Sequence, residues 1–163
     1  MKEKNVLEQS AIENFADAYV KETNTILQFV ELTEPPFADS ICNLDGNKIF
    51  IEVSHIYGTT SDAKQLLDRI GFSTSTDAEN LKARLIPLNH RLIKPLNRLL
   101  EKKSIKKYEG SPVWLLIRNA MPIWAKEEFQ AYYHEIFVPD EHPFEQIWLL
   151  CGPDSESGIL KLF

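Results

Sequence analysis

The chain has 163 residues, of which 44% are hydrophobic and 26% charged, and its net charge is −6. This length predicts a single domain over residues 1–163 with a sizeable core. No run of about 18 apolar residues is present, which predicts no membrane span. The charged start of the chain lacks the apolar segment of a signal peptide, so we expect a cytoplasmic protein.

Apolar residues recur at helical spacing between Lys4 and Glu22, which predicts an amphipathic helix. Glu8 falls near the centre of the apolar stripe, whereas Glu13 falls outside it. An acid on a buried face needs a partner. The alternative is that Glu8 lies near a frayed helix start and is solvated.

A strand is predicted over Thr25–Leu32, and a hairpin over Glu34–His55. Asp45-Gly46 between alternating apolar residues is a strong signal for a two-residue turn. The register that follows places Asp39 directly opposite Glu52.

Opposed like charges destabilise an antiparallel pair. Two carboxylates in these positions therefore predict a bound cation or a shared proton. Strand alternation places Asp39, Glu52 and Ser54 on one face, and an apolar set including Val53 on the other. The alternative is that both acids lie on a solvated face and repel each other weakly.

Asp39 followed by Glu52-Val53-Ser54 resembles the signature of the PD-(D/E)XK nuclease superfamily, which has the restriction-endonuclease-like fold. The resemblance implies that Asp39 and Glu52 bind Mg²⁺ or Mn²⁺, helped by the backbone carbonyl of Val53, and that Glu8 is a further or indirect ligand. Ser54 occupies the position of the motif lysine, and a hydroxyl cannot supply its positive charge.

Three basic residues are candidates to replace that lysine: Lys64 and Arg69, on a short helix predicted from Ser61 to Ile70, and Arg118. A longer helix is predicted from a capping box at Thr76 toward Ser104, with in-phase leucines that continue past two prolines. Nine of the basic residues lie between positions 82 and 107. A stripe of basic residues lies beside the leucines and is predicted to contact nucleic acid. The alternative is that the stripe is a solvated basic face. Its members are Arg84, Arg91, Lys94, Arg98 and Lys102.

The remaining chain predicts a buried strand over Val113–Arg118, an amphipathic aromatic helix over Met121–Phe137, and strands over Gln146–Cys151 and Gly158–Phe163. The order is α-β-β-β-α-β-α-β-β. We therefore expect an α/β fold with a mixed central sheet flanked by helices, and the resemblance implies an α-β-β-β-α-β core of restriction-endonuclease-like type.

Together these features predict a Mg²⁺-dependent nuclease that hydrolyses phosphodiester bonds of DNA or RNA, with Asp39, Glu52, Ser54 and Glu8 at its centre. Two alternatives stay open. Because Ser54 replaces the lysine, the chain could be an inactive nuclease-fold protein that binds nucleic acid or a partner protein. It could also be an interaction protein, such as a homodimer, that uses the aromatic helix over Met121–Phe137.

Overall fold

The computed structural model describes residues 2–57, 88–120 and 124–163, and side chains within the second range from residue 93 onward. The helix predicted over Ser61–Ile70 lies outside these residues, as do Lys64, Arg69 and Arg84. The backbone of Arg91 is described and its side chain is not.

The centre of the molecule is a six-stranded mixed sheet in which spatial order follows chain order. Neighbouring strands are antiparallel except for the pairs β3–β4 and β4–β5, which are parallel. The predicted α/β class with a mixed sheet is confirmed. The strands are β1 (Leu27–Leu32), β2 (Ser40–Leu44), β3 (Asn47–Ile56), β4 (Val113–Asn119), β5 (Gln146–Leu150) and β6 (Ile159–Lys161).

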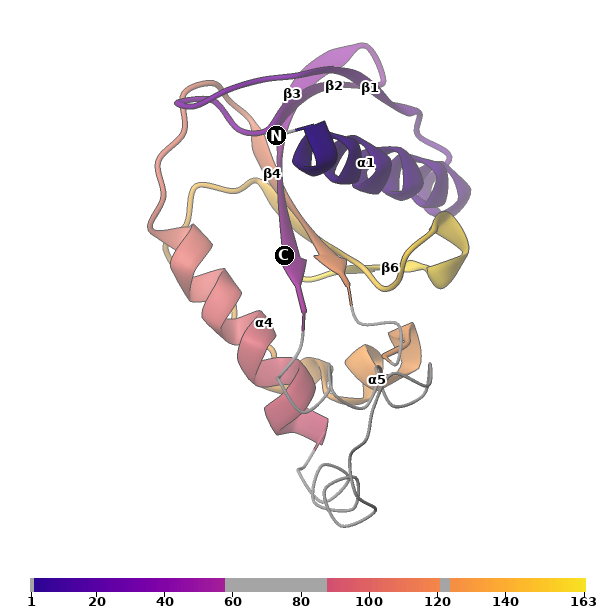
Figure 1. Cartoon of the computed structure of the whole chain (residues 1–163), viewed down its shortest axis with the longest axis vertical. Helices are drawn as coiled ribbons and strands as arrows, with labels where there is room; N and C mark the ends of the chain where they lie inside the picture. The colour runs from indigo at the N-terminus through magenta and orange to yellow at the C-terminus, as the bar shows by residue number, and fades with distance from the viewer. Residues whose placement is uncertain (1, 58–87, 121–123) are drawn as a thin grey trace.

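Helix α1 (Lys2–Thr23) covers one face of the sheet (Figure 1). Its buried side chains, such as Ile12 and Phe15, pack against β-strand residues that include Ile51 and Trp114. A side-chain amide of α1, on Asn14, also bonds the backbone beside the short 3-10 helix η2 (Ser155–Ser157). The predicted N-terminal amphipathic helix is confirmed.

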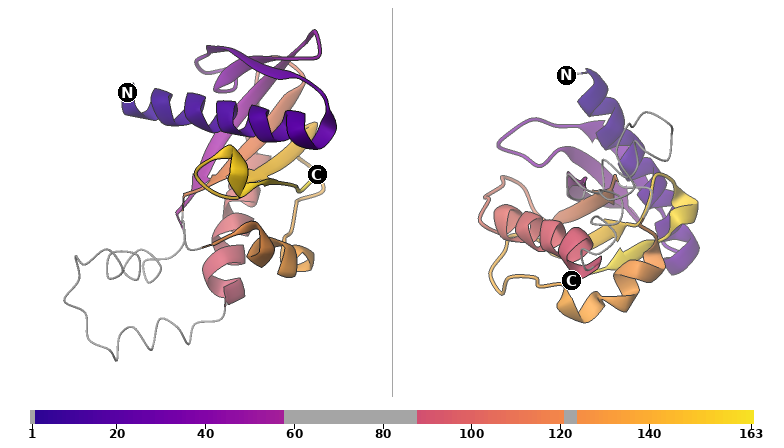
Figure 2. Two further views of the ribbon diagram at one scale, coloured as in Figure 1. Left: turned by 90° about the vertical axis from the view of Figure 1, so that its right-hand side faces the viewer. Right: turned by 60° about the horizontal axis from the view of Figure 1, so that its bottom comes forward.

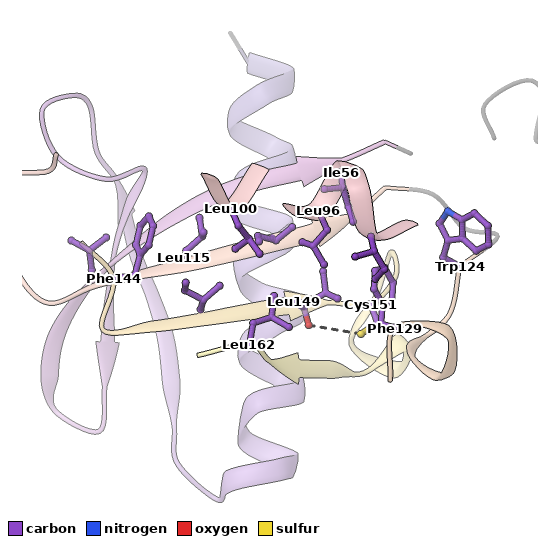
Figure 3. Close-up of a cluster of buried hydrophobic side chains, with 14 of the residues drawn as sticks. Ile56, Leu96, Leu100, Leu115, Trp124, Phe129, Phe144, Leu149, Cys151 and Leu162 are labelled. Atoms are coloured by element: carbon purple, nitrogen blue, oxygen red, sulfur yellow. Dashed lines mark hydrogen bonds between the residues drawn. The ribbon is translucent and has the colours of Figure 1, made fainter. Parts of the chain in front are cut away.

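Helix α4 (Leu88–Ser104) covers the opposite face (Figures 1 and 2). Leu96 and Leu100 are fully buried there, and they pack with strand residues such as Leu115 and Leu149 (Figure 3). Pro95 lies inside the helix, which continues through it as predicted. The sheet is thus enclosed between α1 on one face and α4 on the other.

The aromatic helix predicted over Met121–Phe137 is wrong as a single element. Its described part contains α5 (Lys126–Ala131) and the 3-10 turn η1 (Tyr133–Glu135), and then extended backbone. The amide of Asn97 on α4 donates to the carbonyl of Glu135 at 3.0 Å and accepts from the Phe137 N–H at 2.8 Å. These tertiary bonds replace the bonds that a continuing helix would make.

The aromatic surface predicted to form a homodimer therefore lacks two of its residues, Trp124 and Phe129. Trp124 and Phe129 are buried in the core of this same chain (Figure 3), so they are not available for a partner. The homodimer stays a prediction. In the part of the chain that the structure describes, no helix has the length and apolar character needed to cross a membrane.

Candidate functional site at the free edge of strand β3

The predicted hairpin is confirmed in its turn and in its register. Asp45 and Gly46 have positive φ angles of 49° and 86°. The paired residues run from Leu44 opposite Asn47 to Ser40 opposite Ile51, as the sequence predicts. The turn therefore fixes which side chains of β3 face α4 and which face α1.

The ladder ends one step before the expected pair of Asp39 and Glu52, which corrects the prediction that these acids are ladder partners. The backbone carbonyl of Asp39 accepts from the Thr33 N–H at 2.8 Å. Its carboxylate Oδ2 accepts from the Val53 N–H, also at 2.8 Å. The Asp39 side chain thus accepts the Val53 N–H hydrogen bond that a carbonyl of a partner strand would otherwise accept.

Beyond this point β3 has a described strand partner, β4, on one edge only. A pocket of about 810 Å³ lies along the other edge. Because α1 and α4 cover opposite faces, both layers contribute to its lining at this free edge. The predicted residues Glu8, Asp39, Glu52, Val53 and Ser54 all line the pocket.

Glu52 is paired with Lys103, which is not among the predicted site residues. The Lys103 Nζ lies 3.1 Å from the Glu52 Oε1, and the two side chains are only 12% and 8% exposed. Burial raises the pKa of Glu52, the Asp39 carboxylate raises it further, and Lys103 opposes both effects. A negative charge on Glu52 therefore needs compensation in this place.

Glu8 reaches the same pocket from α1 and is buried, at 4% exposed. This placement agrees with its predicted position on the apolar stripe. Burial raises the pKa of Glu8, and repulsion by Asp39 and Glu52 adds to this effect. Lys4, whose Nζ lies 3.5 Å from the Glu8 Oε1, opposes it.

Two hydroxyl groups lie among these charges. The Oγ of Ser54 is buried and has no hydrogen-bond partner among the described residues. The Tyr108 hydroxyl is also buried and meets no described acceptor with hydrogen-bonding geometry. Burial raises the pKa of the Tyr108 phenol, and the Glu52 and Asp39 carboxylates, which line the same pocket, raise it further. Buried hydroxyls of this kind commonly bond a water or a ligand.

The predicted basic residues whose side chains the structure describes do not line the pocket. Lys94, Arg98 and Lys102 are exposed on α4 and do not line the pocket. The Arg118 Nε donates to the His55 Nδ1 at 3.0 Å. Burial and the Arg118 charge lower the pKa of His55 to about 4, so this imidazole is neutral near pH 7.

Among the described residues, four lysines line the pocket instead: Lys4, Lys103, Lys106 and Lys107. A signal for Lys103 was present in the sequence. It follows Ile93, Leu96 and Leu100 at spacings of three and four residues, so it continues the buried stripe of α4. A lysine on a buried stripe requires a buried partner, and that partner is Glu52.

The pocket offers oxygen ligands of the kind that Mg²⁺ prefers. Asp39 and Glu52 each have one carboxylate oxygen engaged, by the Val53 amide and by Lys103 respectively. No group of three or more His, Cys, Asp or Glu side chains among the described residues is arranged to hold a metal ion. Mg²⁺ commonly binds one or two carboxylates and completes its shell with water and phosphate oxygens, so the donor set fits a two-carboxylate site.

No protein-family model, curated protein or solved structure matches this chain.

Proposed function

We propose that this chain is a metal-dependent phosphodiesterase that acts on nucleic acid and has a restriction-endonuclease-like core. One observation carries the proposal: Asp39 and Glu52 line one pocket beside Lys103, a largely buried lysine in a chain whose motif has Ser54 in place of lysine. Among the described residues, which leave out 58–87 between β3 and α4, the element order α1-β1-β2-β3-α4-β4 agrees with the succession that the resemblance implies.

In this proposal Asp39 and Glu52 hold Mg²⁺ or Mn²⁺, together with the Val53 backbone carbonyl. The bound ion supplies neutralisation of the phosphate charge and a water of lowered pKa. The buried Ser54 hydroxyl orients a water in the pocket. Glu8, whose pKa burial raises, takes up a proton more readily than an exposed glutamate does.

Lys103 supplies the charge of the motif lysine from a different element. It reaches Glu52 from the C-terminal turn of α4, whereas Ser54 follows Glu52 on β3 itself. An ammonium beside the acidic pair lowers the repulsion between these carboxylates and an incoming phosphate. It also offsets the charge that develops as the phosphodiester bond breaks.

Cleavage of labelled single- and double-stranded DNA and RNA, with Mg²⁺ or Mn²⁺, tests the proposal. The variant D39N keeps an acceptor for the Val53 amide but removes the charge. We expect it to lower the cleavage rate by about a hundredfold or more, since the charge stabilisation that a metal supplies is worth several kcal/mol. D45N, which changes an exposed acid in the hairpin turn, should cleave as the unmodified chain does. Equal rates for D39N and D45N would contradict the assignment.

The alternative is a non-catalytic protein of the same fold, and the Lys103–Glu52 ion pair is the observation that favours it. This pair already neutralises one of the two proposed metal ligands. Calorimetric titration of Mg²⁺ alongside the cleavage assay separates the two functions. Nucleic-acid binding without turnover under any metal would support the non-catalytic function.

A further inference from the structure

Two segments far apart in the sequence form one rim of the pocket. Residues 34–37 lie between β1 and β2, and residues 106–109 follow α4. The Glu109 N–H donates to the Pro36 carbonyl at 3.0 Å, and Phe37 forms an isolated parallel bridge with Glu109. These backbone contacts hold an aromatic side chain and two lysines beside one another at the pocket edge.

Phe37 presents a fixed aromatic surface on this rim. Its ring stacks on Phe50, with centroids 5.7 Å apart and an angle of 14° between the ring planes. Phe50 is buried, yet Phe37 is 39% exposed and lines the pocket. The ring is therefore supported on one side and accessible from the pocket, and a flat apolar ligand could cover the accessible part.

The lysines of this rim form a site suited to an anion. Lys106 and Lys107 are exposed and line the pocket with Lys103. The Lys103 charge is the largest cause of a lowered pKa at Lys106, and partial burial adds to it. Lys107 is adjacent to Lys106 in the chain and lines the same pocket, so a phosphate at this rim would meet both of these ammonium groups.

A second exposed aromatic residue lines the same pocket. Tyr57 directly follows β3 and is 61% exposed, and its ring centroid lies 6.1 Å from that of His55. Exposed aromatic rings interspersed with lysines are typical of surfaces that bind single strands, where bases stack on rings and cations follow the backbone.

We propose that Phe37 stacks on an unpaired base of a single-stranded nucleic acid while Lys106 and Lys107 bind an adjacent phosphate, so that the pocket selects single strands over duplexes. The inference rests on the proposed function in taking nucleic acid as the ligand. In a duplex, each base face is covered by its neighbours and is not available to Phe37. Tyr57 offers a second stacking surface along the same strand.

Fluorescence anisotropy with the full chain tests this, using a short labelled single strand of DNA or RNA and the same strand annealed to its complement. EDTA is present, so no metal-dependent cleavage occurs. F37L and F37Y both keep an apolar contact with Phe50, but only F37Y keeps a flat ring. F137L is the matched control, because Phe137 is exposed and does not line the pocket. Circular dichroism establishes that each variant is folded.

We expect single strands to bind more tightly than duplexes, and F37L to weaken single-strand binding roughly tenfold while F37Y and F137L do not. K106Q should reduce the slope of log affinity against log salt by about 0.7 for single strands. The proposal is overturned if duplexes bind equally well, if F37L behaves as F137L does, or if no strand binds.

The two proposals can fail separately. Metal-dependent cleavage that D39N abolishes, together with F37L binding like F137L, removes the stacking inference and leaves the phosphodiesterase. Single-strand binding that requires Phe37, without cleavage under any metal, removes the phosphodiesterase and leaves the stacking inference.

Discussion

At the scale of single residues, the ion pair between Lys103 and Glu52 places a cation beside one of the two proposed metal ligands. From the sequence, the predicted candidates to replace the motif lysine are Lys64, Arg69 and Arg118. Spacing along α4 could have identified Lys103 as a buried lysine. Its partner could not be identified from spacing, because the contact joins residues 51 positions apart.

Replacing Lys103 by methionine should destabilise the protein. The variant leaves the Glu52 carboxylate buried without its cation, which in a pocket open to water should cost roughly 1–3 kcal/mol in the free energy of unfolding near neutral pH. Chemical denaturation measures this cost. K102M changes the exposed neighbouring lysine and should alter stability by no more than about 0.5 kcal/mol.

A double variant completes the test of the pair. E52Q in combination with K103M removes both charges, so the double variant should recover much of the stability that K103M loses. Equal losses for K103M and K102M, or purely additive effects of E52Q and K103M, would show that the ion pair does not contribute as proposed.

At the scale of elements, the hairpin shows which features its own sequence predicts and which depend on contacts with the rest of the chain. The turn at Asp45-Gly46 specifies the register of β2 and β3, because a two-residue turn with positive φ allows only one pairing. The position at which the ladder ends depends on tertiary contacts: the Thr33–Asp39 backbone bond and the bridge from Phe37 to Glu109. No pattern within the hairpin encodes these contacts.

Gly110 lies against the Phe50 ring of the hairpin, so a substitution at Gly110 tests how closely the segment after α4 packs there. Gly110 and Gly46 both have a φ of 86°, which costs a non-glycine residue about 1–2 kcal/mol. A Cβ at Gly110 would also overlap the Phe50 ring, whereas a Cβ at Gly46 would meet nothing within 4 Å. G110A should therefore destabilise the protein by about 1–3 kcal/mol more than G46A does, as overpacking typically costs.

Guanidinium unfolding of the two glycine variants measures that difference directly. Since Phe37 stacks on Phe50, G110A should also weaken single-strand binding if the stacking inference holds, while G46A should not. Equal destabilisation by the two substitutions would mean that Phe50 moves aside without cost.

At the scale of the whole molecule, the sequence predicts the α/β class because its strands are short apolar runs separated by helical periodicity. Glu8 could be placed on a buried face by the same reasoning. The sequence does not predict that Glu8 and Lys103 line the same pocket. They come from helices on opposite faces of the sheet and reach one pocket at the edge of β3 where, among the described residues, the pairing with β2 ends.

The burial of Glu8 near Asp39 and Glu52 predicts how the free energy of unfolding depends on pH. The pKa of Glu8 is raised in the folded protein, foremost by burial, so the folded state binds a proton more readily than the unfolded chain does. Its contribution to stability is thus fully present below about pH 4.5, the ordinary pKa, and is lost as the pH rises through the folded value. His55, whose pKa is lowered to about 4, acts in the opposite direction, since it favours folding above its ordinary pKa near 6.5.

Comparing E8Q with the unmodified chain isolates the Glu8 contribution, because His55 is common to both. In EDTA, E8Q should be more stable than the unmodified chain at about pH 8, and the difference should shrink as the pH falls toward about 4.5. E13Q, which changes an exposed acid on the same helix, should show no such trend. Thermal or urea unfolding across this range measures both. A difference between E8Q and the unmodified chain that is constant with pH would mean that the Glu8 carboxylate is not held in the buried, acid-crowded position on which the proposed site depends.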